Sequence, residues 1–567
     1  MRGARMSAAF DSEPDAMPRL VELLLEEQAT LSAVDAFSTR QEAGDVCADH
    51  RIYEDRIPFG RTPGPGQQLA FRVDLDACTG CKACVTACHS LNGLAPDETW
   101  REIGLLVGDG TGSAVQQIVT TACHHCEDPA CLAGCPVQAY EKDPVTGIVR
   151  HLDDQCIGCQ YCLLKCEYDV PKYNADLGIV RKCDMCTGRL EVGEAPACVQ
   201  GCPNGAITIE IVDQVGEAGK VELLEGLEGA IPDSSHTRPT TRYVSTRSSE
   251  AMRPADSARL APAKAHDPLA IGLVLLQISV GTMLFDGIVS FAGGGVAAMR
   301  SLGPLLAAGF ALFGLGAATA HLGRPLFAFR AILGWRTSWM SREILVFGVY
   351  LPLVLATACL GGWLAIAGSV GRLPGPLAAI VPSLLPVLEA AAILTGLLGT
   401  ASSIMIYVDT KRPAWSLRRT GWTFVGTMIG LGALAESIAL AIASRWAVGT
   451  SRVPIGLLAC MAILALGSKA AFEARFVLTA GYTRDRALAR TVRLLRGPLW
   501  RKTKMRLGLT AVGLGMLSIA TAILLLRGAD MVFLLFSLGS LVACLAGELL
   551  ERHLYFTSEA GPGMPGQ

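Results

Sequence analysis

The sequence predicts an α+β domain followed by an all-α bundle of membrane-spanning helices, and three observations lead to this fold class. Sixteen of the twenty cysteines lie between Cys78 and Cys202. Short stretches of alternating apolar and polar residues flank the cysteine groups, as in strands. After about Asp267 the chain consists mostly of Leu, Ala, Gly, Val and Ile, in eight apolar stretches long enough to cross a bilayer.

Composition divides the 567 residues into five parts. A mean hydropathy of +0.39 beside 18% charged residues averages a polar half with an apolar one. The predicted parts are an N-terminal arm at 1–66, a cysteine-rich domain at 67–215, a linker at 216–266, a helical bundle at 267–557 and a C-terminal tail at 558–567.

The arm shows no targeting pattern. It has neither an adjacent arginine pair nor an apolar core followed by a small-residue cleavage site, so we expect no cleavable or twin-arginine export signal. Cys47 is expected to be a spare thiol. One face of a helix, used for packing or docking, is predicted from Leu20, Val21, Leu24, Leu25 and Leu31.

The sixteen cysteines form four groups of four. The first and third groups share the spacing C-x2-C-x2-C-x3-C, and the second and fourth keep the ending C-x3-C-P after a wider gap. In chain order the groups are Cys78, Cys81, Cys84 and Cys88; Cys123, Cys126, Cys131 and Cys135; Cys156, Cys159, Cys162 and Cys166; Cys183, Cys186, Cys198 and Cys202.

Closely spaced thiolates on a loop, completed by one from elsewhere, suit a 4Fe–4S cluster. Zinc sites built from the C-x2-C pairs leave the other cysteines unexplained, and disulfides require an oxidising compartment. Short strands are expected at 71–76, 147–152 and 206–210. The sequence therefore favours a ferredoxin-like double domain that binds four 4Fe–4S clusters.

The ligand sets depend on which motifs pair. In two-cluster ferredoxins the fourth cysteine of each motif ligates the cluster of the other motif. The second and third motifs are adjacent, so we pair them together and pair the first with the fourth. This predicts set 1 (Cys78, Cys81, Cys84, Cys202), set 2 (Cys88, Cys183, Cys186, Cys198), set 3 (Cys123, Cys126, Cys131, Cys166) and set 4 (Cys135, Cys156, Cys159, Cys162). No set lacks a cysteine, which indicates electron transfer rather than substrate chemistry.

Charged residues flank the cysteine loops. Glu167 stands where a proline is expected, and it either lowers the potential of a neighbouring cluster or is a solvated carboxylate. Five cations either offset cluster charge, dock an acidic partner or lie on an ordinary surface: Lys82, Lys165, Lys172, Arg181 and Lys182.

After the linker, which we expect to be an extended connector, the predicted spans lie near 268–291, 302–322, 343–368, 378–407, 421–444, 453–474, 505–526 and 530–550. The fourth span is the weakest prediction because Pro382 and Pro386 interrupt it. Arginines and lysines concentrate in the loops after spans two, four and six. By the positive-inside rule this side is cytoplasmic, so both ends of the bundle and the cluster domain are expected on the cytoplasmic side of the inner membrane.

Few ionisable residues lie in or at the ends of the spans, which makes each a candidate for function. His321 and Glu343 can bind the carbonyls of a quinone and exchange its protons, with Arg324, Arg336 and Arg342 (and Arg330) beside them. Alternatively His321 caps a helix and Glu343 pairs with Arg342 or Arg336. Weaker candidates are Asp286, Glu389, Glu436, Lys469, Glu473 and Glu548, while Cys359, Cys460 and Cys544 are expected to serve helix packing.

The two halves resemble two known subunits. Residues 68–210, with Cys-Thr-Gly-Cys-Lys-Ala-Cys and Cys-Ile-Gly-Cys-Gln-Tyr-Cys, resemble the four-cluster electron-transfer subunit of DMSO-reductase-type molybdenum enzymes. Residues 267–564, with His-Leu-Gly-Arg-Pro at 321–325 and Trp-Met-Ser-Arg-Glu at 339–343, resemble the eight-helix membrane anchor of DMSO reductase.

This resemblance implies a separate catalytic subunit that carries molybdopterin, quinone chemistry in the anchor at His321 and Glu343, and the pairing of the first motif with the fourth. DMSO reductase places its clusters outside the cytoplasm, whereas the arginine distribution places them inside. The chain is therefore expected to be more similar to cytoplasm-facing sulfite dehydrogenase, with electrons flowing from sulfite to menaquinone or ubiquinone.

Three alternatives stay open. The current can run the other way, from quinol to DMSO or polysulfide. The chain can be a redox-sensing or docking module without turnover. It can also couple electron transfer to ion translocation, for which Glu389 or Glu436 would be needed. Nucleic acid is not an expected partner.

Overall fold

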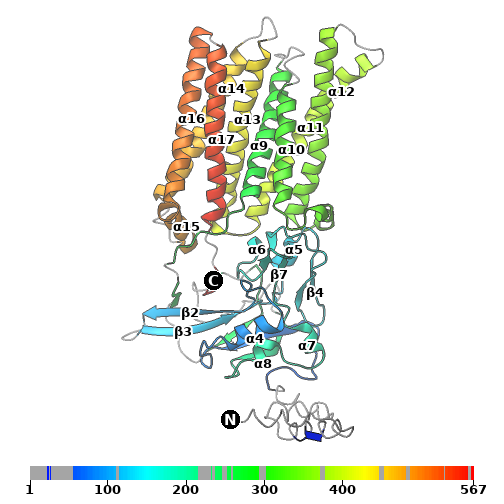
Figure 1. The fold of residues 1–567 in the computed structure, drawn as a ribbon, viewed down its shortest axis with the longest axis vertical. Helices are drawn as coiled ribbons and strands as arrows, with labels where there is room; N and C mark the ends of the chain where they lie inside the picture. The colour runs from blue at the N-terminus through cyan, green and yellow to red at the C-terminus, as the bar shows by residue number, and fades with distance from the viewer. Residues whose placement is uncertain are drawn as a thin grey trace, which may run out of the picture.

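The computed structural model describes residues 22, 23, 26, 55–109, 114–214, 232, 236–245, 252–256, 259–292, 302–370, 377–445, 452–479, 485–528, 530–559 and 563–566. These residues form a cluster domain beneath a helical bundle (Figure 1). Most of the arm lies outside this part of the chain, including Cys47 and all five residues of the predicted helix face, Leu20, Val21, Leu24, Leu25 and Leu31.

The cluster domain is organised by strand β1 (Gln67–Asp74), which delivers the chain to Cys78. Its antiparallel partner β8 (Ile207–Asp213) follows the last cysteine, with Val73 opposite Ile207. Apolar side chains at Leu69, Phe71 and Val73 are buried, so alternate residues of β1 form the core. The first and last motifs are thereby brought together.

Three further sheets complete the domain. β2 (Glu102–Asp109) pairs with β3 (Ala114–Thr121), β4 (Tyr140–Lys142) with β5 (Val149–His151), and β6 (Lys172–Asn174) with β7 (Ile179–Arg181). Short helices follow the cysteine loops: α4 (Ala83–Leu91), α5 (Ala130–Gly134), α6 (Tyr161–Lys165), α7 (Thr187–Glu191) and α8 (Ala197–Gln200).

Two described segments of the linker pair with the cluster domain and form strands that the composition of the linker did not predict. β9 (Arg242–Val244) pairs in parallel with β1, and β10 (Met252–Pro254) pairs antiparallel with β2. The C-terminal tail also returns to this domain, where Met564 is buried in the core beside Leu106 and Met252. The two halves are therefore joined at several places.

The bundle contains the eight predicted spans. They are α9 (Asp267–Phe291), α10 (Leu302–Ala320), α11 (Trp339–Val370), α12 (Leu377–Val408), α13 (Leu417–Ala443), α14 (Val453–Thr479), α16 (Trp500–Arg527) and α17 (Asp530–Thr557). Helix α12 continues through Pro382 and Pro386. Shorter elements lie at the cluster-facing end: η2 (Pro325–Gly334), η3 (Pro413–Trp415) and α15 (Arg486–Arg496).

Candidate functional site

The first and third cysteine loops have the same backbone course because they have the same spacing. Gly80 and Lys82 adopt positive φ angles of 72° and 63°, and Gly158 and Gln160 adopt 67° and 59°. These left-handed residues curl each loop so that its backbone N–H groups point inward. The loops thus present both thiols and donors to one centre.

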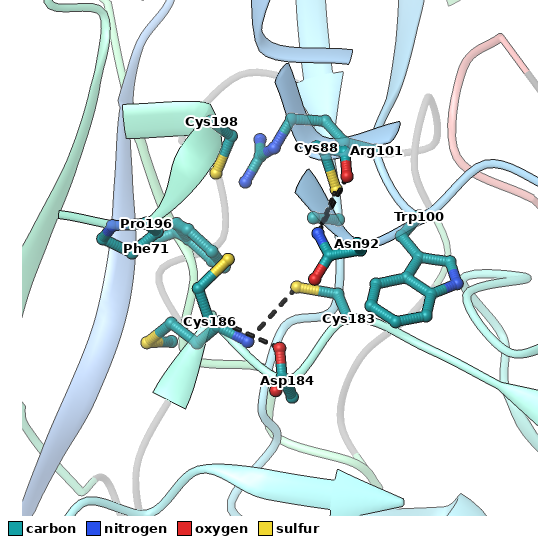
Figure 2. Close-up of a pocket in the computed structure, with 12 residues that line it drawn as sticks. Phe71, Cys88, Asn92, Trp100, Arg101, Cys183, Asp184, Cys186, Pro196 and Cys198 are labelled. Atoms are coloured by element: carbon teal, nitrogen blue, oxygen red, sulfur yellow. Dashed lines mark hydrogen bonds between the residues drawn. The ribbon is translucent and has the colours of Figure 1, made fainter. Parts of the chain in front are cut away.

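Cysteines of sets 1 and 2 line two separate pockets. Cys78, Cys81, Cys84 and Cys202 surround one pocket, together with Gly80 and Thr120. The other pocket is lined by Cys88, Cys183, Cys186 and Cys198, and also by Arg101 (Figure 2). The first and fourth motifs, which are farthest apart in the sequence, therefore contribute to shared pockets.

The cysteines of sets 3 and 4 affect one another within each set. Burial raises the pKa of Cys126 well above its ordinary value, and the nearby Cys123, Cys166 and Cys131 raise it further. Burial also raises the pKa of Cys162 well above its ordinary value, and the nearby Cys159, Cys135 and Cys156 raise it further. Each pKa thus responds to members of its own predicted set.

Interactions between sets fix their order. Cys84 of set 1 lies near Cys198 of set 2, Cys183 of set 2 near Cys123 of set 3, and Cys131 of set 3 near Cys135 of set 4. In Figure 1, α4, α7 and α8 are far from the bundle, whereas α5 and α6 lie directly beneath it. The sets therefore follow one another toward the membrane helices.

The donor sets fit iron–sulfur clusters better than single ions. Backbone N–H groups of Ala139, Gly158, Met185 and Ala206 point at the sulfurs of Cys135, Cys156, Cys183 and Cys202 from 3.2–3.4 Å. Such N–H···S contacts surround cluster sulfurs in iron–sulfur proteins. Within the described ranges, no three His, Cys, Asp or Glu side chains are close enough to share one metal ion. The nineteen cysteines that these ranges contain are free thiols.

Set 4 lies against the bundle. Its loop residue Gly158 accepts a hydrogen bond from the backbone of Gly323, and Ile157 accepts one from Arg324, at 3.4 and 3.0 Å. A Cβ atom on Gly323 would lie 2.1 Å from the carbonyl oxygen of Gly178. Only glycine therefore permits this approach between the cluster domain and the turn after α10.

Helix α6 extends this contact. Tyr161, between Cys159 and Cys162, is fully buried and donates to the carbonyl oxygen of Ile406 on α12 at 2.9 Å. Lys165 forms an ion pair of 2.8 Å with Asp409. Tyr161 belongs to an aromatic cluster. We define this cluster as Tyr161, Tyr407, Trp415, Phe424, Tyr555 and Phe556.

His321 lies at the cluster-facing end of α10, outside the spans. Its ring contacts that of His266, with centroids 4.9 Å apart, and the ring of His266 in turn contacts Phe556 of the aromatic cluster. Burial and the neighbouring His266 and Lys264 lower the pKa of His321 to about 4. The imidazole is therefore neutral near pH 7, with one ring nitrogen that can donate a hydrogen bond and one that can accept one.

Glu343 lies on α11, where its carboxylate accepts a hydrogen bond from Ser403 of α12. Burial raises the pKa of Tyr161, and the charges of Asp409, Cys159 and Glu343 raise it further. Because Glu343 affects Tyr161 in this way, Glu343 lies near the set 4 loop. His321 and Glu343 thus have different direct neighbours. Glu343 lies near Tyr161 and Tyr407 of the aromatic cluster, whereas His321 reaches this cluster only through His266.

The predicted arginines have other partners. Arg324 and Arg330 donate to the carbonyl oxygens of Asp153 and Asp154, so they hold the cluster domain. Arg342 donates to the carbonyl oxygens of Trp335 and Arg336. The guanidinium of Arg336 lies over the ring of Trp335. Glu343 pairs with neither Arg342 nor Arg336.

The weaker candidates form two groups. Asp286 and Glu436 converge beside Gly303, and Glu389 lies beside Gly287, toward the far end of the bundle. Lys469, Glu473 and Glu548 belong to a buried ion network with Arg506, Glu551 and Arg552. Cys544 is buried between helices, whereas Cys359 and Cys460 are exposed in the described structure.

Three residues of the site were not predicted from the sequence. Tyr161 stands inside a cysteine motif but has no special type, and Ser403 is one of many helical serines. Arg101 lies between motifs, and only the fold carries it to set 2. Glu167, predicted to be solvated or potential-lowering, is largely buried 3.7 Å from His236.

Comparisons with known proteins divide the chain in the same way. Residues 264–557 match the family described as the DMSO reductase anchor subunit (DmsC). Residues 114–212 match the family described as the 4Fe-4S dicluster domain. The first match covers more than half of the chain, and the second supports 4Fe–4S cluster binding.

Three curated relatives each match between 26% and 30% of the chain. The chain is 35% identical over 186 residues to YnfG of Escherichia coli (strain K12), which is described as a probable anaerobic dimethyl sulfoxide reductase subunit, covering 30% of this chain and 86% of that protein. It is 38% identical over 189 residues to the hydrogenase-2 operon protein HybA of Escherichia coli O157:H7, covering 29% and 57%. For the formate dehydrogenase-O iron-sulfur subunit of strain K12 the identity is 36% over 170 residues, covering 26% and 56%. The chain thus spans little more than half the length of the last two relatives.

Proposed function

This chain belongs to the DMSO reductase anchor subunit family, and we propose that it relays electrons between a molybdopterin-containing catalytic subunit and a membrane quinone. It joins an iron–sulfur electron-transfer domain to a membrane anchor in one polypeptide. In this proposal each of the four sets ligates one 4Fe–4S cluster. The catalytic subunit binds near set 1, at the end remote from the membrane.

One observation carries the proposal: the sets follow one another toward the bundle, and the last reaches the end where His321 and Glu343 lie. Cys84 adjoins set 2, Cys183 adjoins set 3, and Cys131 adjoins set 4. Tyr161 then links the set 4 loop to α12. A continuous sequence of redox centres from one surface to a membrane site is what electron relay requires.

The clusters, when bound, supply single-electron transfer. The cysteines of the four sets would hold the clusters, and other residues of the chain would transfer protons to and from the quinone. Reduction of a quinone to a quinol takes up two protons. The carboxyl group of Glu343 delivers one, and the imidazole of His321 passes on the other from one ring nitrogen while the other nitrogen receives a proton from water. Tyr161 and its aromatic neighbours exclude water between set 4 and this site, because they are buried.

The direction that we propose is from sulfite to quinone. Sulfite and water give sulfate, two protons and two electrons on the catalytic subunit, and the quinone takes up two electrons and two protons. Arg324, Arg330 and Arg412 all bind backbone carbonyls of the cluster domain, so the arginine-rich loops and the clusters share a face. By the positive-inside rule this face is cytoplasmic.

The relatives favour one alternative direction. YnfG belongs to a probable reductase by its description, so quinol can instead donate electrons through this chain to DMSO or a similar acceptor. Adding sulfite or DMSO to the purified complex with its catalytic subunit distinguishes the two. Sulfite should reduce the clusters, whereas for a reductase DMSO should oxidise clusters that quinol has reduced.

The relay itself is tested on the purified full-length chain. Dithionite reduces the clusters, the excess is removed, and decylubiquinone or menadione is added while electron paramagnetic resonance follows the reduced clusters. We expect reoxidation to be at least about tenfold slower in Glu343→Gln and His321→Ala, as is typical when proton transfer is lost. The matched control is Glu389→Gln on α12.

Unchanged reoxidation in both site variants would move the quinone elsewhere. Slower reoxidation in Glu389→Gln alone would favour the ion-translocating anchor. If the wild-type clusters are not reoxidised by either quinone, a sensing or docking module becomes the better account.

A further inference from the structure

Arg101 is a charged side chain buried inside the cluster domain, with an exposed fraction of only 2%. Its Nη1 donates to the hydroxyl of Thr120 at 3.3 Å, and its guanidinium lies 4.7 Å from the centre of the Phe71 ring. Its Nε and Nη2 atoms are buried without a hydrogen-bond partner in the described structure. Burying a cation in this way costs several kcal/mol unless another charge compensates it.

The groups that face Arg101 are cysteine sulfurs. Arg101 lines the set 2 pocket with Cys88, Cys183 and Cys198, and Figure 2 shows its guanidinium pointing into the space between Cys198 and Cys88. The Thr120 hydroxyl that it contacts lies 3.8 Å from the sulfur of Cys84, a member of set 1. Burial opposes the charge of Arg101, but Cys198, Cys84 and Cys183 raise its pKa. The cation therefore lies where sets 1 and 2 meet.

Lys182 occupies the equivalent place between sets 2 and 3. It is 3% exposed, and its Nζ donates to the carbonyl oxygens of Cys183, at 2.8 Å, and Val149. The same Nζ lies 3.6 Å from the sulfur of Cys123. Each of these two junctions thus contains a buried cation in contact with the cysteine framework.

Neighbouring cations differ because carboxylates neutralise them. Arg181 lies 3.4 Å from Glu98, Lys172 lies 3.2 Å from Glu102, and Lys165 lies 2.8 Å from Asp409. In the part of the chain that the structure describes, Arg101 and Lys182 form no ion pair with a carboxylate. Their charges are left to act on the sulfur sites.

We propose that Arg101 and Lys182 are fixed counter-charges that raise the reduction potentials of the clusters at sets 1 to 3, most strongly at set 2, which both cations adjoin. Reduction adds one negative charge to a cluster, and a nearby cation in a low-dielectric interior stabilises that form. An electron then rests preferentially at set 2, between the partner surface and the membrane. This inference rests on the proposed function, because it requires clusters on these sets.

The test is a redox titration of the purified full-length chain, followed by electron paramagnetic resonance, on Arg101→Met, Arg101→Lys and Lys182→Met. We expect Arg101→Met and Lys182→Met each to lower the potential of two of the four one-electron steps, leaving the others in place. Each shift should correspond to about a tenfold or greater change in the equilibrium constant, about 59 mV for one electron. Arg101→Lys should retain most of the potential because it keeps the charge.

The matched control is Arg242→Met on strand β9, an exposed arginine paired with Glu210 in the same domain. It should leave all four potentials unchanged. The shifts in the buried variants should persist in 0.5 M salt, because screening acts mainly on exposed charges.

Iron analysis separates the possible failures. A wild-type chain that binds no iron would overturn the proposed function. Variants that keep their iron with unmoved potentials, or with all four potentials moved together, would overturn only the counter-charge role. If Arg101→Met loses iron, the potentials of Lys182→Met test the counter-charge role instead. Equal shifts in Arg101→Lys and Arg101→Met would overturn this role, because they would show that packing rather than charge sets the potential.

Discussion

Two groups of buried cations in the described structure are compensated differently. In the bundle, Lys469, Arg506 and Arg552 meet Glu473, Glu548 and Glu551, so cations and carboxylates are equal in number. Lys469 is fully buried and also donates to Thr427 at 2.8 Å. In the cluster domain, by contrast, Arg101 and Lys182 face cysteine sulfurs. The first arrangement is complete within the protein, whereas the second calls for the charge of bound clusters.

Removing Lys469 should therefore destabilise the bundle strongly. Lys469→Met leaves Glu548 and Glu551 without their shared cation, and breaking a buried ion pair in this way costs about 3–5 kcal/mol. The measurement is unfolding of the detergent-solubilised chain by increasing SDS. The double variant Lys469→Met with Glu548→Gln should recover part of the loss, and the exposed Lys504→Met should change little. Equal stability in Lys469→Met and Lys504→Met would contradict the network's role.

His321 gives a pH dependence whose sign follows from its surroundings. Its folded pKa of about 4 lies below the ordinary value of 6.5. Between these two pH values His321 binds a proton in the unfolded chain but not in the folded chain. The free energy of unfolding therefore falls as the pH drops from 6.5 to 4. His321→Gln should reduce this fall, as measured by the apparent Tm in detergent at pH 7 and pH 4.5. An unaltered difference between the two pH values would show that His321 does not titrate in this way.

The sequence predicted the cysteine loops from their spacing and the four sets from a choice of which motifs pair. In the structure the cysteines of set 1 line one pocket and those of set 2 line another. The sequence could not predict Arg101, because this residue precedes β2 in the sequence and only the fold brings it to the set 2 pocket. The partner of Glu343 was also inaccessible: adjacent arginines suggested an ion pair, but a helix places neighbouring residues on different faces, and Ser403 of α12 takes that position.

At the scale of elements, apolar length predicted all eight spans, since a bilayer requires long apolar helices. Elements at the membrane surface were harder. The 3-10 helix η2 and the amphipathic helix α15 have no bilayer-length pattern, and β9 and β10 form only because β1 and β2 offer free edges. Tertiary pairing, rather than local propensity, creates these short strands.

Gly323, in the turn before η2, contacts the set 4 loop. This contact yields a prediction at the scale of elements. Gly323→Ala would place a Cβ atom 2.1 Å from the Gly178 carbonyl oxygen, so the cluster domain must shift away from α10. Cluster reoxidation by a quinone analogue should slow by roughly tenfold or more, because small displacements have large kinetic effects. Iron content should stay unchanged. The control is Gly316→Ala on α10, where an added Cβ meets nothing within 4 Å; an equally slow control would contradict the contact's role.

At the scale of the whole molecule, the fused halves are held together by more than the linker. Arg324, Arg330 and Arg412 of the bundle bind the cluster domain, and Met564 from the tail fills its core. The arrangement keeps set 4 beside the aromatic cluster. Composition predicted the two halves and their order, but not this tail contact, because a single methionine near a chain end has no distinguishing pattern.

The same contacts bear on membrane orientation. The arginines that bind the cluster domain belong to the loops that the positive-inside rule assigns to the cytoplasm. We therefore expect alkaline phosphatase fused after Gly497, on the cluster-facing side, to be inactive in a Gram-negative host. The enzyme fused after Arg527, at the opposite end of α16, should be active because it reaches the periplasm. The reverse pattern would place the clusters outside the cytoplasm, and quinol-dependent reduction of an external acceptor would then become the favoured direction.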